Sequence, residues 1–600
     1  MARDPGQDCH GARARRRYLR DAGLLVRALG LALALGMGLA SSGHAQPVSE
    51  VASGWNDRAP VRAQHWMVAA ANPLAVEAAS AMLAKGGSAV DAAIAAQLVL
   101  GLVEPQSSGL GGGAFMLVHD ARTGALTAYD GRETAPAAAR PDRFLGPGGT
   151  PLAFHQAVVG GLSVGVPGVP RLLALAHRQH GKLRWAELFA PAIALAEHGF
   201  AVSPRLHTLI ASERYFVQPR VRAYFLDADG APLAVGHRLR NPAYAATLRT
   251  LAREGADAFY RGDIARDIVD TADGYAANPG DLTLADLQGY RALARKPVCD
   301  SYRAYRVCGM PPPSSGGITL LQTLAMLAPY DVRSMGAQSL WSVHFIGAAE
   351  RLAYADRDRY IADPAFAEVP HGLLDARYLA ERAALIRSDS VFTRAEAGAP
   401  PGTPAAGGEG ATPEFPSTSQ IVVVDGRGNA ISMTTTIENQ FGSRLMTAGG
   451  FLLNNELTDF SFVATDARGR RVANRVEAGK RPRSTMAPTI AYDRRGKLFM
   501  LTGSPGGAAI VEYVVKTIIG VIDWQLDPQA AVALGNFGSR NGPTYLETGT
   551  AVAALAPKLR AMGYEVRVGP ETSGLQAIVR TRDGWIGGTD PRREGVVRGR

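Results

Sequence analysis

Cysteine is scarce in this sequence, and its scarcity excludes several kinds of site. Only three cysteines occur in 600 residues. No histidine lies next to Cys299 or Cys308, so this pair does not make a zinc site and no metal is expected. The two cysteines are symmetric about a turn near Arg303. A hairpin would place them opposite each other, and in an oxidising compartment a disulfide is favoured over two free thiols.

Long apolar runs are also missing. After residue 45 no run of about 18 apolar residues occurs, so no membrane span is expected in the mature chain. The first 45 residues contain an arginine-rich stretch, a short apolar segment at 28–40, and the small residues Gly43 and Ala45 before Gln46. This order is typical of a secretory signal peptide. It predicts a signal over 1–45 and a periplasmic or secreted protein.

After residue 45 the sequence also has no region of concentrated positive charge. The formal net charge is +10, and the first 45 residues hold seven Arg and three Asp, which leaves about +6 for the rest. No block of basic residues interleaved with aromatics occurs, so nucleic acid is not an expected partner.

A genuine dinucleotide-binding motif is missing as well, despite a superficial match. Gly109, Gly111 and Ala114 have the required spacing. However, a predicted helix precedes them and a strand follows, which reverses the order that the motif needs. We therefore expect no cofactor, and close backbone packing is the better use of these glycines.

Helical and strand patterns occur in both halves of the chain. Two helices are predicted over 73–85 and 88–103, the second with a capping box formed by Ser88 and Asp91. Residues 170–386 look mainly helical, and 388–417 are rich in Gly, Pro and Ala, as in a linker. Strands dominate after that linker. This distribution indicates an α/β or α+β domain that both halves form jointly.

The most informative segment runs from Pro416 to Thr436. A strand pattern begins abruptly at Thr418, and a turn cluster separates it from a return strand over 430–437. Thr418 and Thr436 are symmetric about Arg427, so the hairpin should bring them close. A threonine in this place suits a nucleophile that chain cleavage exposes, with its own α-amine as the base. A surface hairpin after a loop is the alternative.

A glycine-rich turn, TGSPGG at 502–507, precedes a predicted helix. The N–H groups of Gly506 and Gly507 at the helix start can bind an anion, as an oxyanion hole requires. A tight strand-to-helix turn without chemistry is an equal alternative. Ser504 is not a nucleophile elbow, because Thr502 stands where that motif needs glycine.

Seven segments together resemble the γ-glutamyltranspeptidase family of N-terminal nucleophile hydrolases. They occur in the family's order and span nearly the whole chain after residue 45. They are EPQSSGLGGGAFM (104–116), DGRETAP (130–136), MPPPSSGG (310–317), TSQIVVVDGRGNAIS (418–432), FLLNNELTDF (451–460), KRPRSTMAPT (480–489) and TGSPGG (502–507). Each segment alone is weak, but seven in register are strong.

The resemblance implies an α+β fold, a four-layer αββα sandwich made as one precursor. Thr418 Oγ would attack the Ser417 carbonyl, and water would cleave the ester into a large chain of 46–417 and a small chain of 418–600, held together without a covalent link. Thr418 would then attack the γ-amide of glutathione or another γ-glutamyl compound. Thr436 would hydrogen-bond to the nucleophile, and Gly506 and Gly507 would hold the oxyanion. Water, or the amine of an amino acid or peptide, would resolve the γ-glutamyl ester.

The resemblance also assigns residues to the zwitterionic end of the donor. Arg132 matches the arginine that binds the α-carboxylate, and Ser484 and Thr485 match two assisting hydroxyls. Glu456 and Asp459 match the acidic positions around the α-ammonium.

The sequence departs from the family pattern at several places. Glu438 stands where well-known members carry Asn, which adds a negative charge beside the ammonium site. Gln420 replaces a common His, and Thr485 replaces a serine. Residues 461–479 correspond to a lid loop but lack Tyr and Trp.

Two other functions compete with a periplasmic γ-glutamyltransferase and glutathione hydrolase. An acylase of the same fold would remove glutaryl-type side chains from β-lactams. A glutaryl donor has no α-ammonium, so the retained Glu456 and Asp459 favour γ-glutamyl substrates. A non-catalytic binding protein would be expected to lose the nucleophile or the oxyanion glycines, and this sequence keeps both.

Overall fold

The computed structural model describes residues 1–2, 50, 52–404, 407–410, 412 and 414–600. Apart from Met1 and Ala2, the predicted signal peptide at 1–45 lies outside these residues. Among the described residues, no helix is long and apolar enough to cross a bilayer. The unit considered below is Val48–Arg600.

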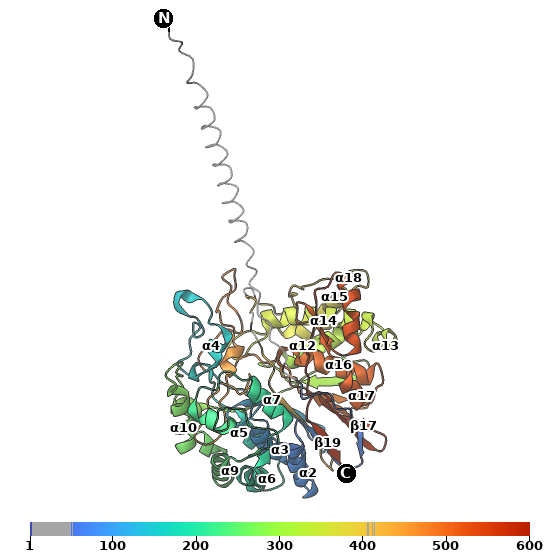
Figure 1. Ribbon diagram of the computed structural model, residues 1–600. Coiled ribbons are helices and arrows are strands. Elements are labelled where there is room, and N and C mark those ends of the chain that lie inside the picture. The colour runs from blue at the N-terminus through green and yellow to red at the C-terminus, as the bar shows by residue number, and fades with distance from the viewer. Residues whose placement is uncertain (3–49, 51, 405–406, 411, 413) are drawn as a thin grey trace. The chain divides into compact units, whose positions relative to one another are not determined.

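Two seven-stranded antiparallel sheets form the centre of this unit (Figure 1). Their strand orders are β1–β18–β17–β13–β12–β9–β8 and β19–β2–β10–β11–β3–β4–β7. The first sheet consists of β1 (Val61–Ala63), β8 (Val298–Tyr302), β9 (Tyr305–Gly309), β12 (Thr489–Tyr492), β13 (Leu498–Gly503), β17 (Gln576–Thr581) and β18 (Gly584–Thr589). The second consists of β2 (Met67–Ala70), β3 (Gly113–His119), β4 (Leu126–Gly131), β7 (Leu293–Arg295), β10 (Ser419–Val424), β11 (Ala430–Thr436) and β19 (Val596–Gly599).

Helices cover the outer face of each sheet, so the layers are α, β, β and α (Figure 1). The helices on the second sheet include α2 (Pro73–Ala84), α3 (Ala89–Val103) and α5 (Val169–His180). Those on the first include α12 (Gly316–Leu327), α16 (Ile510–Ile522) and α17 (Pro528–Ala533), and α14 (Leu340–Tyr360) packs on α12. The predicted α+β fold with an αββα sandwich is confirmed.

The sequence of strand β10 explains why this strand lies in the interior of the second sheet. All six of its residues are buried. Ile421 and Val423 belong to the core cluster that contains residues of α2 and α3. Val422 and Val424 belong to the other large cluster, which contains residues of the first sheet. Alternate residues of a strand point to opposite faces, so a continuous run of β-branched residues fits a strand that is covered on both sides.

The two predicted N-terminal helices begin where their caps are. Asn72 accepts a hydrogen bond from Leu74 N at the start of α2. Ser88 and Asp91 form the predicted capping box at the start of α3. These side chains satisfy N–H groups that have no partner inside the helix.

The segment predicted as a linker, 388–417, contains no helix or strand among its described residues. Its composition is typical of a disordered linker that does not pack on the core, and for the part that the structure describes this expectation is wrong. Ala395, Glu414 and Ser417 are buried, and Gly398 N donates to the Asp356 carboxylate. Its Gly and Pro content therefore suits a path over the core without regular structure, rather than freedom from the core.

Cys299 and Cys308 are cross-strand partners in the hairpin β8–β9 and form a disulfide, with their Cα atoms 4.1 Å apart. Cys308 is fully buried in the core of the first sheet. The symmetry about Arg303 thus gave the correct register, and Arg303 itself has the positive φ of a tight turn.

We expect replacement of both cysteines by serine to lower the free energy of unfolding by about 2–3 kcal/mol, because the crosslink closes only a short loop of the unfolded chain. Denaturant unfolding of the double variant measures this loss. Mass spectrometry of the unreduced wild-type protein should find Cys299 and Cys308 in one linked peptide, and two free thiols would contradict the bond.

Candidate active site

The hairpin β10–β11 brings the two predicted threonines together. Ser419 pairs with Thr435 in the ladder, which places Thr418 beside Thr436 just beyond the paired residues. Their Oγ1 atoms are 3.3 Å apart, and both side chains are buried. The prediction that the hairpin brings them close is confirmed, and the alternative of a surface hairpin is wrong.

The peptide bond between Ser417 and Thr418 lies at the centre of this arrangement. The Thr418 hydroxyl donates to the Ser417 carbonyl oxygen, and Thr436 Oγ1 donates to the same oxygen over 2.9 Å. The Ser417 hydroxyl is fixed by Gln106 O at 2.7 Å. A hydroxyl held against its own preceding carbonyl, with a second hydroxyl donating to that carbonyl, is suited to an acyl shift from nitrogen to oxygen.

A small cavity of about 20 Å³ lies beside this peptide bond. Most of the predicted site residues line it. They are Arg132, Thr418, Thr436, Glu438, Glu456, Asp459, Ser484, Thr485 and Gly507, and Glu414, Phe415, Met486 and Ile510 complete the lining. Ser417 and Gly506 flank lining residues without lining the cavity, and the disulfide lies in another part of the fold.

Arg132 is buried among the acids that the sequence assigns to the opposite charge of the donor. Its guanidinium donates to Glu456, to Asp459 over 2.5 Å, and to the carbonyls of Pro482 and Arg483. In the uncleaved chain the predicted carboxylate-binding residue and two predicted ammonium-binding residues are therefore each other's partners. Binding of a donor carboxylate by Arg132 stays a prediction for the cleaved enzyme.

Glu438 reaches the cavity from a turn and not from a strand. Its spacing of two from Thr436 predicts that Glu438 continues the strand with its side chain on the same face. That prediction is wrong, because β11 ends at Thr436 and Glu438 has φ 72°. Its carboxylate accepts a hydrogen bond from Asn455, and its N–H donates to Thr436 Oγ1 over 2.9 Å. Burial, followed by the charges of Asp459 and Glu456, raises the pKa of Glu438 well above its ordinary value.

The sequence analysis did not single out three residues of the site. Glu133, next to Arg132, is fully buried, and burial followed by the charge of Glu456 raises its pKa. Arg357 on α14 and Glu414, four residues before Thr418, form a buried ion pair. Glu133 could have been found from its place in the DGRETAP segment, whereas only the fold brings Arg357 to the site.

The glycine turn at 502–507 lies against the segment that precedes Thr418. Gly506 and Gly507 have φ of 145° and 56°, and a Cβ on Gly507 would lie 2.6 Å from the Phe415 carbonyl oxygen. Glycine is therefore required here by close backbone approach. Their part in an oxyanion hole stays a prediction.

Gln420, which replaces a histidine of the family pattern, lies between the sheets. It donates to Ser432 Oγ over 2.9 Å and accepts from Thr434 Oγ1 over 2.6 Å. Its amide joins β10 to β11 and does not line the cavity. This departure therefore affects sheet packing and leaves the lining of the cavity unchanged.

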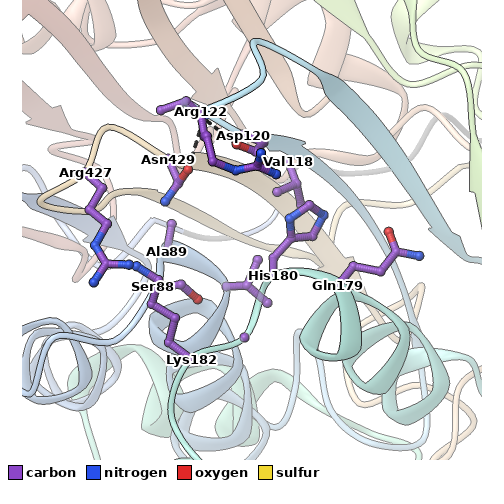
Figure 2. A pocket seen from close by; sticks show the side chains of 13 residues that line it. Ser88, Ala89, Val118, Asp120, Arg122, Gln179, His180, Lys182, Arg427 and Asn429 are labelled. Carbon is purple, nitrogen blue, oxygen red and sulfur yellow. Dashed lines mark hydrogen bonds and ion pairs between the residues drawn. The ribbon is translucent and has the colours of Figure 1, made fainter.

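A larger cavity of about 390 Å³ lies at the opposite, turn end of the same hairpin (Figure 2). Its lining includes Arg427 and Asn429 of the turn together with Arg122, His180 and Lys182. None of the predicted catalytic or donor-binding residues lines this cavity. We therefore place the chemistry at the smaller cavity beside Thr418.

Glu438→Gln is expected to lower kcat/KM for γ-glutamyl donors about tenfold or more, because a charge-assisted contact to the α-ammonium is lost. Glutaryl donors, which lack that amine, should change little. The raised pKa means that Glu438 gains its charge as pH rises. The ratio of wild-type to variant kcat/KM for γ-glutamyl donors should therefore increase with pH. Equal losses for both donor types would contradict the ammonium role.

Comparisons with known proteins agree with this geometry. The profile of the family Gamma-glutamyltranspeptidase matches residues 75–599. The glutathione hydrolase proenzyme of Bacillus subtilis (strain 168) is 36% identical over 522 residues, which cover 85% of this chain and 87% of that protein. The glutathione hydrolase proenzyme of Escherichia coli (strain K12) is 34% identical over 585 residues, 94% of this chain and 97% of that protein. The crystal structure of cephalosporin acylase from Bacillus halodurans superposes with a TM-score of 0.77 at 27% identity and covers 91% of this chain and 97% of that chain.

The fold and its structural neighbours define the class, an N-terminal nucleophile hydrolase with the αββα architecture. The profile match and the identities over most of the chain go further. The chain belongs to the γ-glutamyltranspeptidase family, a family of enzymes.

Proposed function

We propose that this chain is a self-cleaving precursor of a γ-glutamyltransferase that also hydrolyses glutathione. The observation that carries the proposal is the contact of the Thr418 hydroxyl with the Ser417 carbonyl, completed by Thr436. The family names of the similar proenzymes support it.

In the first reaction, Thr418 Oγ1 attacks the Ser417 carbonyl carbon. The C–N bond breaks, the proton from Oγ1 goes to the departing nitrogen, and an ester joins Ser417 to Thr418 Oγ1. Water then hydrolyses the ester. Ser417 becomes the carboxyl end of the large chain, 46–417, and Thr418 becomes the amino end of the small chain, 418–600. The two chains stay together as a heterodimer.

In the second reaction, the freed α-amine of Thr418 takes the proton of its own hydroxyl. Oγ1 attacks the γ-amide carbonyl of the donor, and the N–H groups of Gly506 and Gly507 stabilise the oxyanion. The amine leaves with a proton. Water hydrolyses the resulting γ-glutamyl ester of Thr418 to glutamate. If the amine of an amino acid or peptide attacks that ester instead, the product is a new γ-glutamyl amide.

The charges around the cavity support a γ-glutamyl donor. Glu438, Glu456 and Asp459 line it together. An α-ammonium beside these groups favours their charged forms, because an opposite charge lowers the pKa of a carboxyl. The similarity to a cephalosporin acylase favours glutaryl-type β-lactams as the second candidate, but a glutaryl group brings no ammonium to join Arg132 as a partner of these three carboxyl groups.

One experiment tests both candidates. Release of p-nitroaniline from γ-glutamyl-p-nitroanilide and from glutaryl-p-nitroanilide should be compared on the purified protein. We expect the γ-glutamyl donor to react with at least tenfold higher kcat/KM. A preference for the glutaryl donor would contradict the proposed γ-glutamyltransferase and favour the acylase function.

The periplasm or the exterior of the cell is the proposed location. The signal pattern at 1–45 and the cysteine pair support it. N-terminal sequencing of the large chain from a periplasmic fraction should begin near Gln46. Recovery of the whole activity from the cytoplasm, with residues 1–45 intact, would contradict the location.

A further inference from the structure

Two residues shortly before Thr418 form part of the cavity wall in the uncleaved chain. They are Glu414 and Phe415. The ring of Phe415 stacks on Phe154 with centroids 3.9 Å apart, and Glu414 is buried. With these residues in place the cavity measures only about 20 Å³, so a donor needs their displacement to enter.

Glu414 makes contacts that would suit a donor carboxylate. Its carboxylate accepts hydrogen bonds from the Thr485 hydroxyl and from the Arg357 guanidinium. Arg357 Nη2 is also 2.6 Å from Thr485 Oγ1, so the two donors converge on one position. Thr485 is one of the two hydroxyl residues that the family pattern assigns to the donor α-carboxylate. A carboxylate of the chain itself therefore lies on a predicted carboxylate-binding residue.

The charges around Glu414 favour an anion at this position. Arg357 is buried, and Arg483 Nη2 lies 3.8 Å from Glu414 and 3.3 Å from Asp358. Burial opposes ionisation of Glu414, but Arg357 and Arg483 outweigh it and lower the pKa of the carboxyl. If Glu414 leaves, Asp358 is, among the described residues, the one carboxylate left within 4.0 Å of the Arg357 and Arg483 nitrogens, and Asp459 acts on Arg483 from farther away. Loss of one partner from a buried ion pair is costly.

The same cavity is also lined by acidic residues. Glu438, Glu456 and Asp459 line it with Arg132, which is paired with Glu456 and Asp459. A γ-glutamyl donor carries one carboxylate and one ammonium on its α-carbon. Its carboxylate could replace that of Glu414 at Arg357 and Thr485 while its ammonium lies beside these acids.

We infer that Glu414 is an internal occupant of the donor site: before cleavage its carboxylate holds the subsite in which Arg357 and Thr485 bind the α-carboxylate of the donor after cleavage. The inference rests on the proposed function for the identity of the donor. It makes Arg357 a further donor-binding residue and gives the precursor a reason to be inactive besides its blocked amine. Cleavage ends the covalent tie between Glu414 and Thr418, which allows the exchange.

The first test uses the mature enzyme and two donors. γ-Glutamyl-p-nitroanilide has the α-carboxylate, and 4-aminobutyryl-p-nitroanilide has the same amine without it. We expect Arg357→Lys to raise KM at least tenfold for the first donor, because lysine lacks the fork of N–H groups. kcat/KM for the second donor should stay within about twofold, an allowance for small packing changes. Arg351→Lys is the matched control, a buried arginine on the same helix that contacts Thr544. Equal effects on both donors, or none, would overturn the inference.

The second test needs no activity and is therefore independent of the proposed function. In the uncleaved Thr418→Ala protein, Glu414→Ala removes one of the two carboxylates that pair with Arg357 in the part of the chain that the structure describes, and leaves only Asp358. We expect sodium formate to raise the Tm of this double variant more than sodium chloride at equal ionic strength. The formate effect should vanish when Arg357→Gln is added and persist when Arg351→Gln is added instead. A formate effect no larger than that of chloride would overturn the inference, even if the enzyme proves active on γ-glutamyl donors. If the wild-type protein is inactive while the double variant still shows the formate effect, only the proposed function is contradicted.

Discussion

Thr418→Ala is expected to yield one uncut chain with no detectable release of p-nitroaniline from a γ-glutamyl anilide. The variant lacks the hydroxyl that lies against the Ser417 carbonyl, and without it neither the acyl shift nor the later attack on the donor has a nucleophile. Denaturing electrophoresis and N-terminal sequencing measure the first effect. The wild-type protein should give two chains, one of which begins at Thr418.

Two controls make this result specific. Thr435→Ala removes a buried neighbouring hydroxyl that donates to Gly113 O over 3.3 Å and does not line the cavity. It should leave cleavage intact. If Thr418→Ala protein still appeared as two chains cut at the same bond, another protease would be responsible and self-cleavage would be wrong.

Arg132→Lys is expected to lower kcat/KM for γ-glutamyl donors by about two orders of magnitude, or about 3 kcal/mol of transition-state binding. The guanidinium bridges Glu456 and Asp459 and donates to two carbonyls. A lysine ammonium keeps the charge but cannot reproduce this planar set of bonds. Steady-state kinetics with γ-glutamyl-p-nitroanilide measure the loss.

A matched control for this substitution lies in the same half of the chain. Arg143 makes two 2.7 Å bonds to Asp281 and does not line the cavity. Arg143→Lys should therefore leave the kinetics near the wild-type values. Arg132→Ala is a poorer probe, because two buried carboxylates without their cation would cost about 3–5 kcal/mol of stability. Wild-type kinetics for Arg132→Lys would remove this residue from the site.

The parts of the structure that the sequence predicted well depend on short-range patterns. The turn around Arg427 and the run of β-branched residues determine the hairpin, and the hairpin determines that Thr418 meets Thr436. The capping box at Ser88 and the cysteine symmetry about Arg303 are equally local. In each case a few neighbouring residues restrict the backbone, so the local structure depends little on tertiary contacts.

The features that the sequence did not predict depend on long-range contacts. Arg132 meets Glu456 across 324 positions, and Arg357 meets Glu414 across 57. No periodicity records which buried charges will share a cavity, because that depends on how two sheets and their helices stack. The linker composition of 388–417 was misleading for the same reason, since Gly and Pro describe the local backbone and not what it packs against.

The strand order of the two sheets has a consequence for the cleaved protein. In the second sheet β10 and β11 lie between β2 and β3, and in the first sheet β12 lies beside β9. Cutting before Thr418 therefore leaves two chains interleaved through shared ladders. Dilution should not separate them, because separation requires both sheets to open. Once unfolded, however, the cut pair must find each other as separate molecules, whereas the precursor folds with its parts tethered. We therefore expect the uncut chain to refold after denaturation more readily than the cleaved pair.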